Sequence, residues 1–178
     1  MKDNVWFTYK ARIQAHKRLE WLDIHSQFLL VWYAILSAVL AIVAIRYPQA
    51  LGANTDILAA VLSVALLGVS LAVANRDFRG RALTMMKNYK DLQKLYNLLS
   101  SASSVTDAHS NTYHELLSKS ENHKEIDDKR FRTSAVSTLQ TRKPTKFDFF
   151  HVYCWLTIRA LVTVFLYFGP IAAAWYLK

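Results

Sequence analysis

Two stretches of the chain, residues 26–45 and 57–74, contain no Asp, Glu, Lys, Arg or His, although one residue in five is charged overall. The first is 20 residues long, the second is 18, and eleven residues separate them. A helix needs about 20 apolar residues to cross a bilayer core, within a range of about 17–25. Both stretches are therefore predicted to be transmembrane helices joined by a short turn. The alternative is two buried helices of a water-soluble domain, where uncharged runs of this length are uncommon.

A third apolar segment covers residues 147–178, and residues 160–177 within it carry no charge. Aromatic side chains gather near both of its ends, which is typical of anchors at the membrane interface. We expect a third span that ends outside the cell and kinks at Gly169-Pro170. A helix lying along the membrane surface is a further alternative, which the length of the segment disfavours.

Arg159 leaves two interpretations of this third span open. In one, Arg159 lies within the membrane and faces a pathway or a partner, as deep charges usually do. In the other, its long side chain reaches the cytoplasmic headgroups and the span proper begins after it.

The distribution of positive charge predicts the orientation in the membrane. The net charge is +9, and residues 1–25 hold five Lys and Arg, while residues 46–56 hold one. Residues 75–148 hold fourteen, against nine Asp and Glu. Basic residues near spans stay on the cytoplasmic side. We therefore expect the N-terminus and residues 75–146 in the cytoplasm, with the turn and the C-terminus on the outer side of the membrane.

These patterns predict an all-α membrane protein: a transmembrane hairpin, cytoplasmic helical extensions and a third C-terminal transmembrane helix. The expected divisions are 1–25 (amphipathic helix), 26–74 (hairpin), 75–146 (cytoplasmic region) and 147–178 (third span). The amphipathic helix should run into the first span without a break. A stalk helix is expected over about 75–99, then a Ser-rich linker over 100–112.

A further helix is expected after this linker. Asp107 or Asn111 would cap its start, and it would end near His123. The segment 124–146 has no clear pattern, although residues 133–141 favour either a short helix or a strand.

The stalk carries a row of basic side chains that could meet a negatively charged partner. Contact with anionic lipid is the first interpretation, and recognition of a nucleotide or nucleic acid is the alternative. The residues of this basic face are Arg76, Arg79, Arg81, Lys87, Lys90 and Lys94.

Small residues recur in the spans at a spacing that permits close helix contact in lipid. We treat them, together with Arg159, as candidates for helix packing or for lining a pore. Such residues also occur in any packed membrane helix, where serine can bond to its own backbone. The small candidates are Ala34, Ser37, Ala38, Ala59, Ser63, Gly68, Ser70 and Ala72.

The sequence shows no pattern of catalysis, cofactor binding or metal binding. Cys154 is the single cysteine, and the six histidines have no metal-ligand spacing. The densest polar cluster is Glu121-Asn122-His123 with Asp127-Asp128. Such a cluster could bind a metal or act as acid and base, but it far more often caps a helix. We therefore expect no enzyme activity.

Several of these features together resemble a known family. The lead-in to the first span reads KARIQAHKRLEWLD over residues 10–23, and Trp32-Tyr33 follows where the span opens. Tyr113, Glu121-Asn122-His123 and Asp127 come later in the chain. In this order the parts resemble the SLATT domain proteins, small membrane effectors of bacterial anti-phage conflict systems. The resemblance is to the fifth subfamily and covers essentially the whole chain.

This resemblance implies a function that periodicity does not. A partner enzyme that makes a nucleotide or nucleic-acid signal would trigger the protein, which would form a homo-oligomeric pore and depolarise the inner membrane. The infected cell would then stop growing before phage release. Members of this branch are often encoded beside reverse transcriptases, so a reverse transcriptase is an expected partner.

Two rival functions share the same topology. The chain could be a membrane anchor that tethers a cytoplasmic reverse transcriptase, or another nucleic-acid enzyme, without forming a pore. It could also be a transporter subunit, although the absence of carboxylates from the spans disfavours this.

Overall fold

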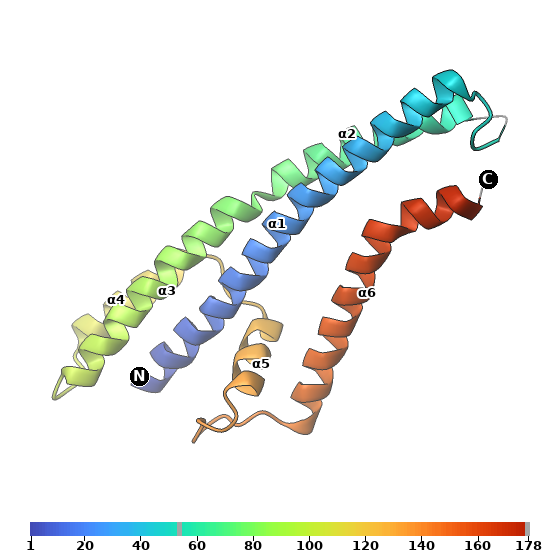
Figure 1. Cartoon of the computed structure of the whole chain (residues 1–178). Coiled ribbons are helices and arrows are strands. Elements are labelled where there is room, and N and C mark those ends of the chain that lie inside the picture. The colour runs from blue at the N-terminus through green and yellow to red at the C-terminus, as the bar shows by residue number, and fades with distance from the viewer. Residues whose placement is uncertain (53–54, 177–178) are drawn as a thin grey trace. The chain divides into compact units, whose positions relative to one another are not determined.

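The computed structural model describes residues 1–52 and 55–176 and contains six helices within them (Figure 1). Over these residues there is no β-strand, and three helices are long and apolar enough to cross a membrane. The predicted fold class, an all-α membrane protein, is confirmed. The helices are α1 Lys2–Arg46, α2 Thr55–Arg76, α3 Phe78–Ser101, α4 Asp107–Ser118, α5 Glu125–Ser134 and α6 Lys146–Tyr176.

The chain forms two compact units. The first, here called the bundle unit, consists of Met1–Leu22 and Phe78–Trp155. The second, here called the membrane unit, consists of Asp23–Asp77 and Leu156–Lys178, described as far as Tyr176. Helices α1 and α6 each contribute residues to both units. The divisions expected from the sequence, at residues 25, 74 and 146, stay predictions.

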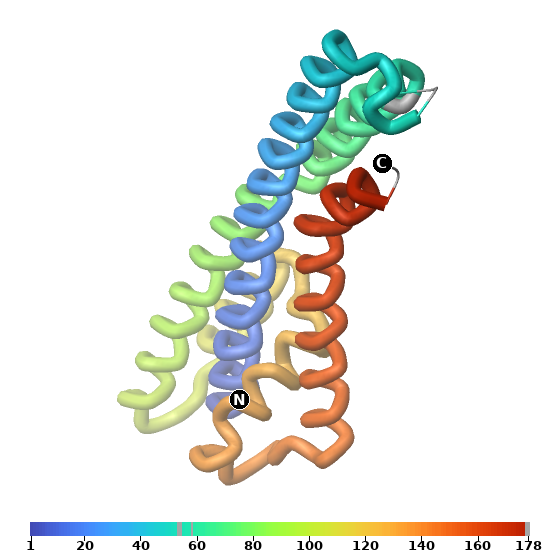
Figure 2. The backbone as a smooth tube through the Cα atoms, turned by 45° about the vertical axis from the view of Figure 1, so that its right-hand side comes forward, coloured from blue at the N-terminus to red at the C-terminus, as the bar shows by residue number. Residues whose placement is uncertain are grey.

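Helix α1 has the continuity that the sequence predicted, because the amphipathic lead-in and the first span form one helix of 45 residues. Its N-terminal part runs beside α3 in the bundle unit (Figures 1 and 2). Val5 and Tyr9 pack there against Leu92 and Leu99 of α3 and Leu116 of α4, and all five are buried. Each fully buried side chain of this size contributes about 1.5–3 kcal/mol, so this apolar contact stabilises the packing of α1 against α3 and α4.

The stalk helix begins later than expected. Helix α2 ends at Arg76, Asp77 has a φ of 41°, and α3 begins at Phe78 rather than near residue 75. The left-handed conformation interrupts the helix, and Asp adopts it more readily than most residues. The break was not foreseen because neither Gly nor Pro marks it.

The segment that follows α3 also differs from the prediction. Thr106, rather than Asp107 or Asn111, precedes the first turn of α4, and its backbone N–H donates to His109 Nδ1 over 3.3 Å. The helix ends at Ser118, well before His123. Helix α5 occupies part of the segment without a clear pattern, and residues 135–138, beyond its end, form turns. The expected helix or strand over 133–141 is therefore wrong.

In the membrane unit, side-chain hydrogen bonds join the three apolar helices. Trp32 Nε1 donates to the Tyr167 carbonyl of α6 over 3.1 Å. The Ser37 and Ser63 hydroxyls of α1 and α2 are 3.1 Å apart. Helix α6 contains Pro170 and bends toward its C-terminal end (Figure 1), as Gly169-Pro170 predicted. Residues 177 and 178, the end of the expected third span, lie outside the described residues.

Candidate functional site

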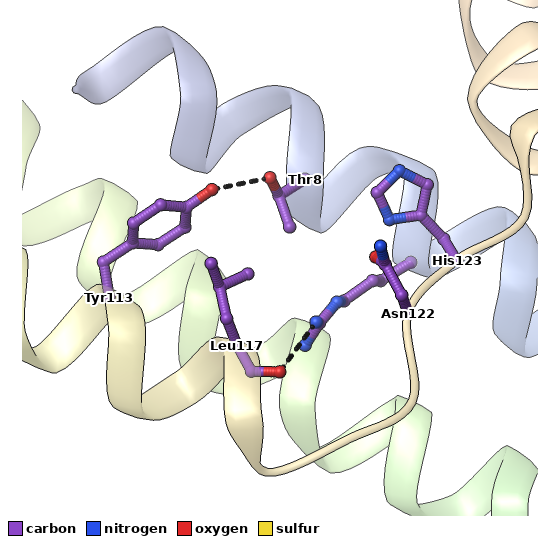
Figure 3. A pocket seen from close by; sticks show the side chains of 6 residues that line it. Thr8, Tyr113, Leu117, Asn122 and His123 are labelled. Atoms are coloured by element: carbon purple, nitrogen blue, oxygen red, sulfur yellow. Dashed lines mark hydrogen bonds between the residues drawn. The ribbon is translucent and has the colours of Figure 1, made fainter.

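Three segments of the bundle unit meet around a pocket of about 370 Å³ (Figure 3). Thr8 and Arg12 are four residues apart on α1, so they lie on one face of that helix. Tyr113 and Leu117 have the same spacing on α4. The connection from α4 to α5 adds Asn122 and His123, which lie on the opposite side of the pocket from Tyr113.

Two hydroxyls close one side of this pocket. The Tyr113 and Thr8 hydroxyls are 2.9 Å apart and point toward one another (Figure 3). Because one of the two donates to the other, the remaining hydroxyl hydrogen is free to bond elsewhere. This bond also ties α4 to α1, so the two helices that form the pocket are held in a fixed register.

Arg12 is the most unusual residue of the pocket, because only 1% of it is exposed. Its guanidinium donates to Asn88 Oδ1 and to the carbonyls of Leu116 and Leu117, the last two over 3.4 and 3.3 Å. All three acceptors are uncharged, and the Nε–H has no acceptor. Burial lowers the pKa of Arg12, and Tyr113 partly opposes this shift.

Arg18 provides a direct comparison, because it is also buried and lies on the same helix. Its Nε and Nη2 donate to the two carboxylate oxygens of Asp127 over 2.9 and 3.0 Å. Asp127 also accepts from the backbone N–H of Lys124, over 2.9 Å, at the start of α5. This carboxylate therefore neutralises a buried charge and caps a helix, which is a structural role.

His123 faces the pocket from the side opposite Tyr113. Its Nδ1 is buried and has no hydrogen-bond partner. Burial lowers the pKa of His123 and Arg12 adds to the shift, while Asp128 and Asp127 oppose it. The imidazole is thus held mainly in its neutral form, with a ring nitrogen available to a ligand.

One comparison with known proteins establishes the family. The family described as "SMODS and SLOG-associating 2TM effector domain family 5", or SLATT family 5, matches residues 1–177. The chain belongs to this family. No curated protein and no solved structure matches it. It is thus a membrane effector domain of defence systems, in a family that is not a known enzyme family.

The remaining motif residue of this SLATT domain, Glu121, lies outside the pocket. It is exposed and accepts two hydrogen bonds from Arg81, over 3.1 and 2.8 Å. Arg81 is partly buried, whereas the other members of the basic face are exposed. Among those, Lys94 bonds to Asp91 over 3.1 Å. The exposed members are Arg76, Arg79, Lys87, Lys90 and Lys94; whether they bind lipid or nucleic acid stays a prediction.

The small residues of the spans lie mostly on exposed surface. A Cβ added to Gly68 would meet nothing within 4 Å. Ser63 and Ser70 donate to the carbonyls of Ala59 and Leu66 on their own helix, which is the ordinary role of serine in a membrane helix. Of the others, Ala34, Ala38 and Ala72 are exposed, and Ser37 and Ala59 are partly buried.

Arg159 lies on the part of α6 that belongs to the membrane unit, where it is partly buried. Its carbonyl accepts from the Thr163 hydroxyl over 2.7 Å. Whether its side chain sits within the membrane stays a prediction, as does a role in lining a pore.

Sequence reasoning found Tyr113, Asn122 and His123 but missed Thr8, Arg12 and Leu117, which complete the pocket. A signal for Arg12 was present, because it lies seven residues from both Val5 and Leu19, and all three are at most 1% exposed. A spacing of seven places residues on the same side of a helix. Within the described residues, no group of three or more His, Cys, Asp or Glu could hold a metal ion.

Proposed function

We propose that this SLATT domain is triggered to assemble into a homo-oligomeric pore that depolarises the bacterial inner membrane. The trigger is a partner enzyme or the nucleotide or nucleic acid that this enzyme makes. Loss of the membrane potential stops the infected cell before phage release.

The observation that carries this proposal is the uncovered apolar surface of the membrane unit. Large apolar side chains such as Phe28, Ile42, Val64, Leu67 and Phe165 are more than half exposed. The most apolar window of each of the three long helices contains no buried residue. Exposure of so much apolar surface to water is unfavourable, so we expect lipid or other copies of the chain to cover these faces.

A pore requires more than one copy, because three helices enclose no channel. Gly68 offers a contact site, since the space next to it is open and small residues let helices approach closely in lipid. The spans carry no ring of acidic side chains, so a pore lined by their serines would select weakly between ions.

The trigger is proposed from the family description, which names association with SMODS and SLOG. A reverse transcriptase is a second candidate for the partner enzyme. Contact between either partner and the basic face of α3 would involve its exposed cations, including Arg79, Lys87 and Lys90.

The test is to express the chain alone and together with its neighbouring enzyme in bacteria that carry a voltage-sensitive dye. We expect depolarisation only when the chain and an active enzyme are both present, and we expect Gly68→Leu to abolish it. A membrane-tethered enzyme with an unchanged potential would contradict the pore and support the membrane anchor instead.

The orientation can be tested separately, because Cys154 is the single cysteine. In a Cys154→Ser background, a cysteine at Gln49 should react with a membrane-impermeant maleimide in intact cells. A cysteine at exposed Ser104 should react only after lysis. Labelling of Ser104→Cys in intact cells would contradict a cytoplasmic bundle unit.

A further inference from the structure

Helix α1 buries two arginines in the bundle unit, and only one of them meets a negative charge. Arg18 is matched by the Asp127 carboxylate. Arg12 is more deeply buried, yet its three acceptors are an amide oxygen and two backbone carbonyls. Arg18 donates its Nε–H to Asp127, whereas the Nε–H of Arg12 has no acceptor.

A buried cation without a counter-charge is costly, because its attraction to neutral dipoles does not replace the hydration that it loses. For this reason, removing one partner from a buried ion pair strongly destabilises a protein. The surroundings of Arg12 are therefore those of one member of an ion pair, and no carboxylate of the described residues is bonded to it.

The pocket beside Arg12 has the volume and the hydrogen-bond donors to hold an anionic ligand. Its volume of about 370 Å³ is at the lower end of the range of about 300–1,000 Å³ that is typical of small-molecule sites. Besides Arg12, its lining includes the Thr8–Tyr113 hydroxyl pair, the Asn122 amide and the His123 ring. Asn122 is exposed, so a ligand can enter from solvent.

We propose that this pocket binds the phosphate group of a small molecule, with Arg12 as the charged anchor. A phosphate has three or more oxygens and can accept from several donors at once, whereas a carboxylate has two oxygens. The donors converge from two helices and a connection, which suits the larger group. The volume suits a phosphorylated molecule of about mononucleotide size or smaller.

The carboxylates near His123 do not oppose an anion as strongly as their number suggests. Asp127 is bonded to Arg18 through both oxygens. Asp128 is bonded to Arg132 over 2.8 Å. Each is thus largely neutralised by its own arginine, which leaves the charge of Arg12 as the unmatched one at the pocket.

This inference rests on the proposed function, because it names the chemical class of the trigger. It does not require that the protein forms a pore. Binding can be measured on full-length protein in nanodiscs of zwitterionic lipid, where ion flow plays no part. A chain that binds phosphate but leaves the membrane potential unchanged would uphold the pocket and contradict the pore.

Two groups of probes distinguish a free ligand from a lipid headgroup. Inorganic phosphate and adenosine monophosphate are titrated into zwitterionic nanodiscs, with acetate as the carboxylate comparison. Binding is followed by phosphorus NMR line width and by the shift in melting temperature. In parallel, the protein is placed in nanodiscs that contain phosphatidic acid. We expect saturable binding of a soluble probe that is tighter than the binding of acetate. If phosphatidic acid alone stabilises the protein, the phosphate that the pocket binds belongs to a lipid headgroup.

Matched variants test the residues. Arg12→Gln should weaken binding of the phosphate probe at least about tenfold, the loss expected for one charge-assisted hydrogen bond. Because Arg12→Gln also removes bonds to Asn88 and α4, we add Asn122→Ala and His123→Ala at the edge of the pocket, each expected to weaken binding several-fold. Lys143→Gln removes one exposed charge that lies outside both the pocket and the basic face, and it should change binding less than twofold.

Two results would overturn the proposal. One is the absence of saturable binding of any phosphate probe, soluble or lipid. The other is an equal loss of affinity in Lys143→Gln and in the three pocket variants, because this would show diffuse attraction to a basic protein rather than a site.

Discussion

The Tyr33 hydroxyl donates a hydrogen bond to the backbone carbonyl of Leu166 over 2.8 Å. Leu166 lies four residues before Pro170, which has no N–H, so no helical donor is available to this carbonyl. Trp32 donates to the next carbonyl, that of Tyr167. An unsatisfied carbonyl in hydrocarbon costs several kcal/mol, so the Tyr33 hydroxyl compensates within the membrane unit for the proline of α6.

We expect Tyr33→Phe to destabilise the protein by about 1 kcal/mol, within the range measured for side-chain hydrogen bonds in membrane proteins. In a Pro170→Ala background the helix regains its N–H donor, so the same substitution should cost clearly less. Denaturant unfolding in detergent micelles, run on all four proteins, gives the coupling between the two positions. An equal cost in both backgrounds would show that Tyr33 does not replace the missing donor.

Gly68→Leu should shift the protein from oligomers toward smaller species. A side chain at this position meets nothing within one copy, so any effect on assembly reports a contact with another copy. Leu66→Ala, on the same helix, is the matched control and should assemble as the wild type does. Chemical cross-linking in native membranes provides the measurement, and identical oligomer distributions for both variants would refute the contact.

Replacing Arg76, Arg79 and Arg81 together with glutamine should weaken binding of a single-stranded oligonucleotide or of anionic lipid. Exposed charges act through a screened field, so the loss should be large at low salt and small at high salt. The binding constant is measured over a series of salt concentrations.

The triple variant needs a control because Arg81 is bonded to Glu121. Glu121→Gln removes this contact but leaves all three arginines in place, and it should retain binding. If the triple variant loses binding equally at every salt concentration, the cause is misfolding rather than lost charge.

The lowered pKa of His123 predicts a pH dependence of stability. The folded protein takes up a proton at His123 only below the ordinary pKa of 6.5, whereas the unfolded chain takes it up near that value. Stability is therefore highest above about pH 6.5 and falls as the pH drops from there toward the folded pKa, by at most about 1.4 kcal/mol per pH unit.

Melting temperatures from pH 7.5 to 5.5 test this dependence. The wild type should lose more stability on acidification than His123→Gln does. His114→Gln, which replaces an exposed histidine on α4, should behave like the wild type. If the melting temperatures of the wild type and of His123→Gln fall in parallel as the pH drops, the pH dependence does not come from His123.

Local patterns allowed much of the fold to be predicted but not its helix boundaries. The uncharged runs predicted the apolar parts of α1, α2 and α6, because lipid selects for them residue by residue. The break at Asp77 could not be predicted, since it depends on one backbone angle of a residue that also fits within a helix. The start of α4 was misplaced by one residue or more, because Thr, Asp and Asn all serve as helix caps.

The amino-acid sequence by itself determined that this SLATT domain has three membrane-compatible helices, because length and absence of charge suffice for that. Only the tertiary structure decided that Arg12 is buried beside a pocket. Its acceptors, Asn88 and the carbonyls of Leu116 and Leu117, lie 76 to 105 residues away in the chain. A buried charge is defined by what surrounds it in space, and no local pattern of residues records those surroundings.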